Sequence, residues 1–274
     1  MKRALALAYG ICVYLFFLGT LLYAIAFVGS FTVPKTIDTG TTSSISVAMS
    51  INVLLLTVFA LQHSVMARQG FKKWWTKIVP KPVERATFVL SATIALAELL
   101  WQWRAIPSIV WDLRGTTAGV VLIGVFVSGW SILLLSTFLV NHFELFGLEQ
   151  VWSYFRGHEP KAPSFKTPGL YRLVRHPIYL GFVIGFWATP VMTWGHLLFA
   201  VACTGYILVG IAFEERDLIA AYGQAYRDYR RRVPMLIPFR KPTKSPQTTG
   251  AGTAVQPVLY EELTFEEIIN RMNA

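Results

Sequence analysis

The sequence predicts an all-α integral membrane protein, a polytopic helical bundle with four full spans and a C-terminal two-helix hairpin. Of its 274 residues, 54% are hydrophobic and only 15% are charged, whereas soluble domains carry about a quarter charged residues. Long apolar runs take up most of the chain. These observations exclude a water-soluble fold and leave no room for a separate soluble domain.

Four apolar segments are long enough to cross the hydrocarbon core as helices, which takes about 20 residues. They are residues 5–31, 45–67, 86–103 and 116–140. The first follows Lys2 and Arg3 and is too long for the apolar region of a signal peptide, which is roughly 7 to 15 residues. We therefore expect it to be retained as the first transmembrane helix.

The hairpin is predicted over residues 178–213, which are apolar throughout but interrupted near Thr193-Trp194-Gly195. Divided there, the segment gives two short helices and brings the total to five or six membrane segments. Pro190 and several glycines favour kinks and close approach between the two halves. These glycines are Gly185, Gly195, Gly205 and Gly210.

The formal charge of +10 is explained by membrane topology. If the N-terminus is cytoplasmic, all but three of the 25 Lys and Arg residues fall on the cytoplasmic side, the exceptions being Lys35, Arg104 and Arg114. By the positive-inside rule, both termini are expected in the cytoplasm. The lipid bilayer is then the partner of this chain, and we expect no nucleic acid.

The remaining composition predicts neither a disulfide framework nor a metal site. Cys12 and Cys203 lie inside apolar runs, where packing is their expected role. The five histidines lack metal-ligand spacing. Residues 241–274 begin as a flexible linker rich in Lys, Pro, Thr, Ser, Gln and Gly, and end in a short amphipathic helix.

Two polar blocks flank the hairpin, residues 169–181 (GLYRLVRHPIYLG) and residues 214–234 (EERDLIAAYGQAYRDYRRRVP). A helix is expected to start at Pro177, and the hairpin should return the second block to the first. Glu214 and Glu215 either bind the amino group or ribose hydroxyls of a ligand, or pair with Arg175 and Arg230. An interfacial belt with salt-bridged glutamates is the alternative interpretation.

In combination, the two blocks closely resemble the signature of the isoprenylcysteine carboxyl methyltransferase family and its bacterial relatives. The resemblance implies S-adenosylmethionine as cofactor, in a cytosolic pocket over the hairpin, and makes residues 141–240 the cofactor-binding region after the transmembrane helices of residues 1–140. The candidate cofactor-binding residues are Tyr171, Arg175, His176, Pro177, Tyr179, Glu214, Glu215, Tyr226 and Tyr229.

The upstream half narrows the resemblance. Residues 62–68 (QHSVMAR) look like the NnrU-type membrane family, and residues 141–148 (NHFELFGL) follow the fourth span. The order of blocks over residues 1–240 resembles bacterial members that methylate a small thiol, methanethiol to dimethyl sulfide. This resemblance implies a bacterial inner (plasma) membrane location.

A simple thiol is mostly protonated at neutral pH, so a group that accepts its proton is expected. His142 and His63 both fall at the cytoplasmic boundary and are the candidates, with Glu144 or Asn141 orienting the imidazole. Alternatively, Arg68 and Arg175 lower the pKa of the thiol by their charge.

Three other functions remain open from the sequence. The first is methylation of a larger lipophilic acceptor such as a prenylcysteine, and the second is a membrane reductase of the sterol-reductase type. The third is a nonenzymatic transporter or scaffold, against which the spans carry few charges apart from Glu98. The sequence does not predict an oligomeric state.

Overall fold

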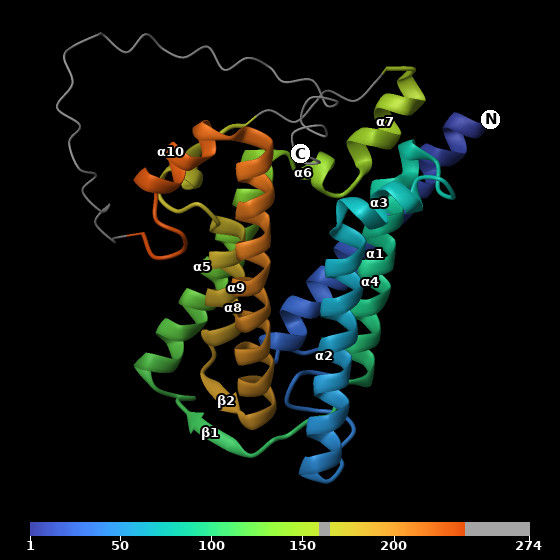
Figure 1. The fold of residues 1–274 in the computed structure, drawn as a ribbon. Helices are drawn as coiled ribbons and strands as arrows, with labels where there is room; N and C mark the ends of the chain where they lie inside the picture. The colour runs from blue at the N-terminus through green and yellow to red at the C-terminus, as the bar shows by residue number, and fades with distance from the viewer. Residues whose placement is uncertain (159–164, 239–274) are drawn as a thin grey trace, which may run out of the picture. The chain divides into compact units, whose positions relative to one another are not determined.

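A computed structural model describes residues 1–158 and 165–238, which are mostly helical (Figure 1). The chain forms two compact units. The larger unit is Met1–Pro160 with Ile178–Gly210, and the smaller unit is Lys161–Pro177 with Ile211–Ala274. The linker and amphipathic helix expected over residues 241–274 lie outside the described residues.

The larger unit contains the helices of the N-terminal half. Their bounds are α1 Lys2–Val28, α2 Ile45–Ala67, α3 Gln69–Trp75, α4 Lys81–Gln102, α5 Thr117–Val140, α6 His142–Leu145 and α7 Leu148–Arg156. Helix α8 covers Pro177–Trp187, and the long α9, Trp194–Tyr222, begins in the larger unit and ends in the smaller one.

Four described helices, α1, α2, α5 and α9, are long and apolar enough to cross a membrane. Many of their large apolar side chains are exposed, such as Leu54 at 62% and Val120 at 69%. A helix satisfies its own backbone hydrogen bonds, so such a surface is stable against lipid. The chain is therefore an integral membrane protein, as the sequence predicts.

The structure differs from the predicted set of spans in two places. The third expected span, residues 86–103, is helical as part of α4, but α4 is not among the four apolar helices. This helix carries Glu84 and Arg85 before the apolar run and Glu98 within it. The hairpin is not made of two short helices: α8 has 11 residues, whereas α9 has 29. Continuous helical hydrogen bonding carries α9 beyond the apolar run and through Glu214 and Glu215.

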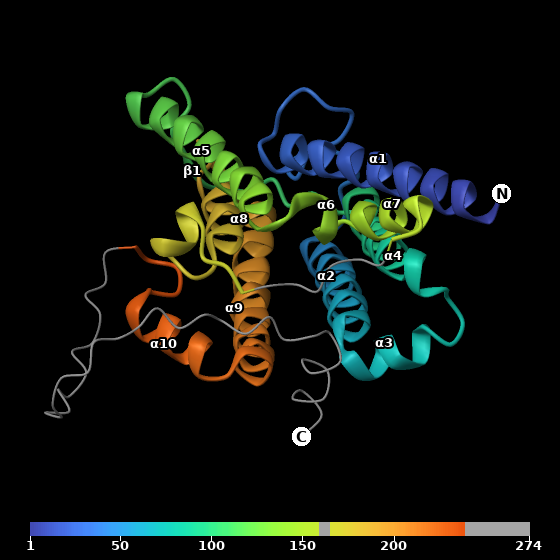
Figure 2. The ribbon, with the colours of Figure 1, turned by 90° about the horizontal axis from the view of Figure 1, so that it is seen from above.

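Helices α1, α4 and α7 lie side by side within the larger unit (Figure 2). A core cluster of Val13, Phe88 and Val89 joins α1 to α4. The partly buried side chains packed against this cluster are Tyr9, Phe17, Met66, Leu90 and Phe146. The short α6 segment is thus attached to the α1 and α4 core through Phe146, directly after it.

Close helix packing through glycine occurs between α5 and α8. A Cβ added to Gly181 would lie 2.6 Å from the carbonyl oxygen of Gly129 and 2.7 Å from the backbone nitrogen of Leu133. Small residues let membrane helices approach closely. The expected close approach within the hairpin at Gly205 and Gly210 is wrong, because both face open space.

A short antiparallel pairing of β1, Ile109–Asp112, with β2, Val191–Thr193, joins two distant loops of the larger unit. The pairing was not predicted from the sequence, because strands of four and three residues are too short for a periodic pattern.

Helix α5 starts just after β1. The Thr116 hydroxyl accepts a hydrogen bond from the Gly119 N–H and caps the helix.

The described part of the smaller unit holds a 3₁₀ turn, Gly169–Arg172, the end of α9, and α10, Gln224–Arg232. Gly223 separates the two helices at φ +57°, a value that glycine adopts without steric cost. Tyr226 and Tyr229 on α10 are buried, and their rings contact Phe165.

Candidate active site

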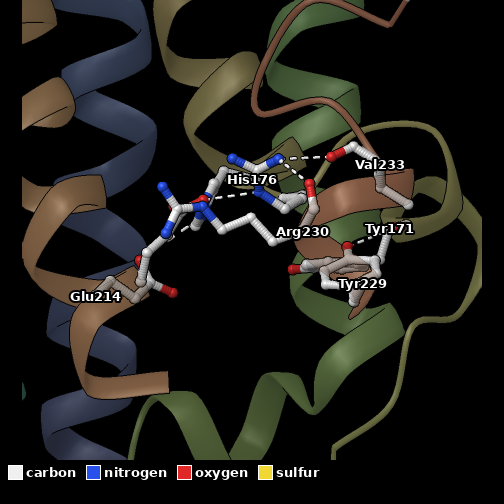
Figure 3. A network of polar contacts seen from close by, with 8 residues as sticks. Tyr171, His176, Glu214, Tyr229, Arg230 and Val233 are labelled. Atoms are coloured by element: carbon white, nitrogen blue, oxygen red, sulfur yellow. Dashed lines mark hydrogen bonds and ion pairs between the residues drawn. The ribbon is translucent and has the colours of Figure 1, made fainter. Parts of the chain in front are cut away.

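Glu215 is the centre of an ion-pair network in the smaller unit. Figure 3 shows the surroundings of this network, with His176, Glu214 and Arg230 among the labelled residues. Its Oε1 accepts from Arg175 Nε at 2.7 Å and lies 3.2 Å from His176 Nε2, and its Oε2 pairs with Arg230 Nε at 3.2 Å. The Glu215 side chain is 8% exposed. The sequence-based alternative that a glutamate pairs with Arg175 and Arg230 is confirmed for Glu215.

Arg175 also connects the segment before α8 to the segment after α10. Its Nη1 donates to the carbonyl oxygens of Arg230 and Val233, at 3.1 and 2.6 Å. The backbone N–H groups of Arg175 and His176 donate to Pro234 and Met235. Because the planar guanidinium holds several acceptors at once, Arg175 fixes the position of the buried His176.

Glu214 has different surroundings from Glu215. Its Oε2 is buried but has no hydrogen-bond partner among the described residues, and it lies 3.9 Å from His176 Nδ1, too far for a hydrogen bond. A buried carboxylate oxygen without a partner is costly. Glu214 therefore remains able to accept hydrogen bonds from a ligand.

Three tyrosines complete the network around these carboxylates. The Tyr229 hydroxyl donates to the carbonyl oxygen of Tyr171 at 2.6 Å, and burial raises the pKa of Tyr229 to about 12. Burial likewise raises the pKa of Tyr226, whose buried hydroxyl has no partner in the described part of the chain. Tyr226 therefore keeps its proton at neutral pH and offers it to an acceptor.

Helix α8 begins at Pro177, as predicted, and Tyr179 lies half-buried on its first turn. The first N–H groups of a helix have no partner within the helix and carry a partial positive charge. The start of α8 therefore offers backbone hydrogen-bond donors. Glu214, in the second block, offers a buried carboxylate oxygen without a hydrogen-bond partner among the described residues.

His142 lies in the larger unit at the start of α6. Its Nε2 lies 2.8 Å from the hydroxyl of Tyr14, and its Nδ1 lies 2.8 Å from the hydroxyl of Thr137. Burial lowers the pKa of His142. The expectation that Asn141 or Glu144 orients this ring is wrong, because Tyr14 and Thr137 hold it.

Asn141 and Glu144 form a separate polar cluster beside His142 in sequence. The Asn141 amide donates to Glu144 Oε2 at 3.0 Å and to Glu149 Oε2 at 2.5 Å. Burial and the nearby Glu149 raise the pKa of Glu144. The Asn141 side chain also caps α6 by accepting from the Glu144 N–H, which accounts for both residues structurally.

His63 lies on α2 with its ring stacked on Phe59, at 5.7 Å between centroids, and 5.2 Å from Phe88. Its Nδ1 is buried and has no hydrogen-bond partner among the residues described. The ring of His63 is held by aromatic packing, whereas the ring of His142 has two hydrogen bonds in addition to its aromatic contacts. Residues 1–158 and 165–238 contain no group of three or more His, Cys, Asp or Glu residues placed to hold a metal ion.

The class of protein follows from the apolar helices and from a family comparison. Residues 116–225, which contain both polar blocks up to Ala225, match the phospholipid methyltransferase family. Together with the relatives described below, this match makes the chain a helical membrane methyltransferase, which uses a methyl donor. No solved structure matches it.

Relatives of nearly full length define the family more narrowly. Methanethiol S-methyltransferase 1 of Bradyrhizobium diazoefficiens is 56% identical over 87% of this chain and 84% of the relative. The methanethiol S-methyltransferase of Mycobacterium tuberculosis is also 56% identical, over 87% of this chain and 98% of its own length. Methanethiol S-methyltransferase 2 of B. diazoefficiens is 52% identical over 91% of this chain and 98% of the relative. The chain belongs to the methanethiol S-methyltransferase family.

Proposed function

We propose that the protein transfers a methyl group from S-adenosylmethionine to methanethiol, producing dimethyl sulfide. The observation that carries this function is the 56% identity to two methanethiol S-methyltransferases over 87% of the chain. Residues 116–225, which include His142, the first polar block and the second as far as Ala225, also match the phospholipid methyltransferase family. A larger acceptor and a reductase have no comparable support.

We propose that the network of the smaller unit binds S-adenosylmethionine. Two buried polar atoms without hydrogen-bond partners in the described chain support this assignment, Glu214 Oε2 and the Tyr226 hydroxyl oxygen. Ribose hydroxyls or an ammonium group would satisfy the carboxylate, and the ligand's carboxylate would accept from the hydroxyl. The other proposed contacts are His176, Tyr171, Pro177 and Tyr179, with Arg175, Glu215 and Tyr229 holding the site in place.

When bound, S-adenosylmethionine supplies an electrophilic methyl group on a positively charged sulfur, and its transfer leaves S-adenosylhomocysteine. The acceptor must lose its S–H proton, because the thiolate is the reactive nucleophile. His142 is the proposed proton acceptor, since it is neutral at pH 7 and its ring is fixed by two hydrogen bonds. His63 is the second candidate, and Asn141 and Glu144 support the α6 turn.

The test uses purified protein in detergent with S-adenosylmethionine and methanethiol. Dimethyl sulfide is followed in the headspace and S-adenosylhomocysteine in solution, for the wild type and for Glu214→Gln, His142→Gln and His63→Gln. We expect both products in equal amounts, a weakened affinity for S-adenosylmethionine only in Glu214→Gln, and a lower rate at unchanged affinity in His142→Gln. Binding of S-adenosylmethionine without formation of dimethyl sulfide would overturn the proposal that methanethiol is the acceptor. Absence of binding would overturn the proposal that S-adenosylmethionine is the cofactor.

We further propose that the protein lies in the bacterial inner membrane with both termini in the cytoplasm. The distribution of Lys and Arg supports this orientation, since only Lys35, Arg104 and Arg114 would lie on the outer side. The thiol and S-adenosylmethionine would then both be taken from the cytoplasmic side.

A further inference from the structure

The Tyr14 hydroxyl forms a hydrogen bond with His142, which lies 128 positions further along the sequence. It lies in the middle of α1, in a segment that the sequence identifies only as a transmembrane helix. A tyrosine hydroxyl in a span is expected to have a hydrogen-bond partner. The partner here is the proposed proton acceptor of the reaction.

The direction of each hydrogen bond follows from the inventory of donors. The Thr137 hydroxyl donates its single hydrogen to the carbonyl oxygen of Leu134 at 2.7 Å. It can therefore only accept from His142, which places a hydrogen on Nδ1. In the neutral imidazole Nε2 then has no hydrogen, so the Tyr14 hydroxyl donates to it.

The Tyr14 oxygen keeps its acceptor capacity in this arrangement. A hydroxyl donates once and accepts up to twice, and the one hydrogen of Tyr14 is used on His142. No donor to this oxygen is recorded in the part of the chain that the structure describes. Tyr14 is half-buried, whereas His142 is 6% exposed, so Tyr14 is the more accessible residue of the pair.

Aromatic rings surround the pair. The His142 ring stacks on Phe138 at 4.2 Å and contacts the edge of Phe146 at 4.9 Å. Tyr14 and Phe143 lie 6.4 Å apart, and Phe143 is also in edge contact with His142. Sulfur packs favourably against aromatic rings, so these surroundings suit a small thiol better than a charged or strongly hydrated acceptor.

We infer that Tyr14 is a catalytic residue that contacts the thiol and passes its proton to His142. This inference rests on the proposed function. The S–H bond breaks and its proton goes to the Tyr14 oxygen, while the original Tyr14 hydrogen moves to His142 Nε2. The products are a thiolate, an unchanged tyrosine and an imidazolium, so charge and atoms balance, and the imidazolium later releases the proton to water.

The experiment compares Tyr14→Phe with the wild type on ethanethiol and on 2,2,2-trifluoroethanethiol. The two thiols are of similar size, but the fluorines make the second more acidic. Tyr9→Phe is the matched control, because the Tyr9 hydroxyl lies on the same helix and bonds Thr87 instead. Affinity for S-adenosylmethionine is measured for each protein by calorimetry.

We expect Tyr14→Phe to reduce kcat for ethanethiol by about 100-fold, the usual contribution of a positioned proton-transfer group, and to reduce it by less than about tenfold for the acidic thiol. The affinity for S-adenosylmethionine and the rates of Tyr9→Phe should stay at wild-type values. Equal losses with both thiols would mean that Tyr14 acts only structurally and would overturn the inference, as would unchanged kcat.

The reactions of the wild-type protein distinguish a failure of the inference about Tyr14 from a failure of the proposed function. If it methylates neither thiol although it binds S-adenosylmethionine, the proposed acceptor class fails, and the role of Tyr14 fails with it. If it methylates both and Tyr14→Phe does as well, the function stands and only the inference about Tyr14 is overturned.

Discussion

At the scale of single residues, Glu214 and Glu215 are adjacent in sequence but have different partners. Glu215 faces three cationic or imidazole groups, whereas Glu214 Oε2 has no hydrogen-bond partner among the described residues. We expect Glu215→Gln to destabilise the protein by on the order of 3 kcal/mol, because it leaves the Arg175 charge, 10% exposed, without its carboxylate. Thermal unfolding in detergent measures this loss.

The matched control is Glu214→Gln. It should leave the unfolding temperature nearly unchanged while weakening the binding of S-adenosylmethionine, since a polar change away from structural contacts alters stability by about 0.5 kcal/mol or less. Equal destabilisation by the two variants would contradict this division of roles.

We expect the buried imidazole of His142 to determine how kcat/KM falls on the acid side of its pH profile. Burial holds its pKa below the usual value of 6.5, so the neutral, proton-accepting form persists as the pH falls through 6.5 and is lost only at lower pH. The thiol stays protonated in this range. We expect kcat/KM to fall below pH 6.5 and not above it.

The measurement is kcat/KM as a function of pH, which reports groups of the free enzyme. In His142→Gln this acid limb should disappear, and the residual rate should rise with pH as the thiolate fraction rises. An acid limb centred above pH 6.5, or one that survives the substitution, would show that another group accepts the proton.

At the scale of elements, the contact between α5 and α8 depends on the absence of a side chain at Gly181. We expect Gly181→Ala to cost about 1–3 kcal/mol, as overpacking does, because the new methyl group would lie 2.6 Å from a backbone oxygen of α5. Gly124→Ala on α5 is the control, since nothing lies within 4 Å of its added Cβ. Unfolding in detergent should distinguish the variants, and equal stability would argue against tight packing here.

Helix α10 is attached to the segment before α8 through the fork of Arg175. Arg175→Lys keeps the charge beside Glu215 but cannot also reach the carbonyl oxygens of Arg230 and Val233. We expect faster hydrogen exchange over residues 224–232 in this variant. The control is Arg172→Lys, at an exposed position in the 3₁₀ turn, and it should leave the hydrogen exchange unchanged. If exchange over residues 224–232 became faster in both variants, a specific role of Arg175 would be contradicted.

At the scale of the whole molecule, hydropathy and local motifs predict the helices and the two polar blocks, because both signals are short in range. The pairing of Glu215 with Arg175 was foreseeable from the returning hairpin and from the charges. The contact between Tyr14 and His142 was not, since 128 positions separate them and a tyrosine in a span has many possible partners. The length of α9 was also missed, because backbone hydrogen bonding continues where hydropathy ends.

The orientation in the membrane gives a last prediction. With both termini in the cytoplasm, the loop between α1 and α2 lies outside and the loop between α3 and α4 lies inside. In a background of Cys12→Ser and Cys203→Ser, we introduce Ser43→Cys in the first loop and Lys77→Cys in the second, both at exposed positions. A membrane-impermeant maleimide should label Ser43→Cys in intact spheroplasts and Lys77→Cys only after the membrane is opened. The reverse pattern would place most of the Lys and Arg residues outside, against the positive-inside rule, and would put the network of Glu215 on the side away from cytoplasmic S-adenosylmethionine.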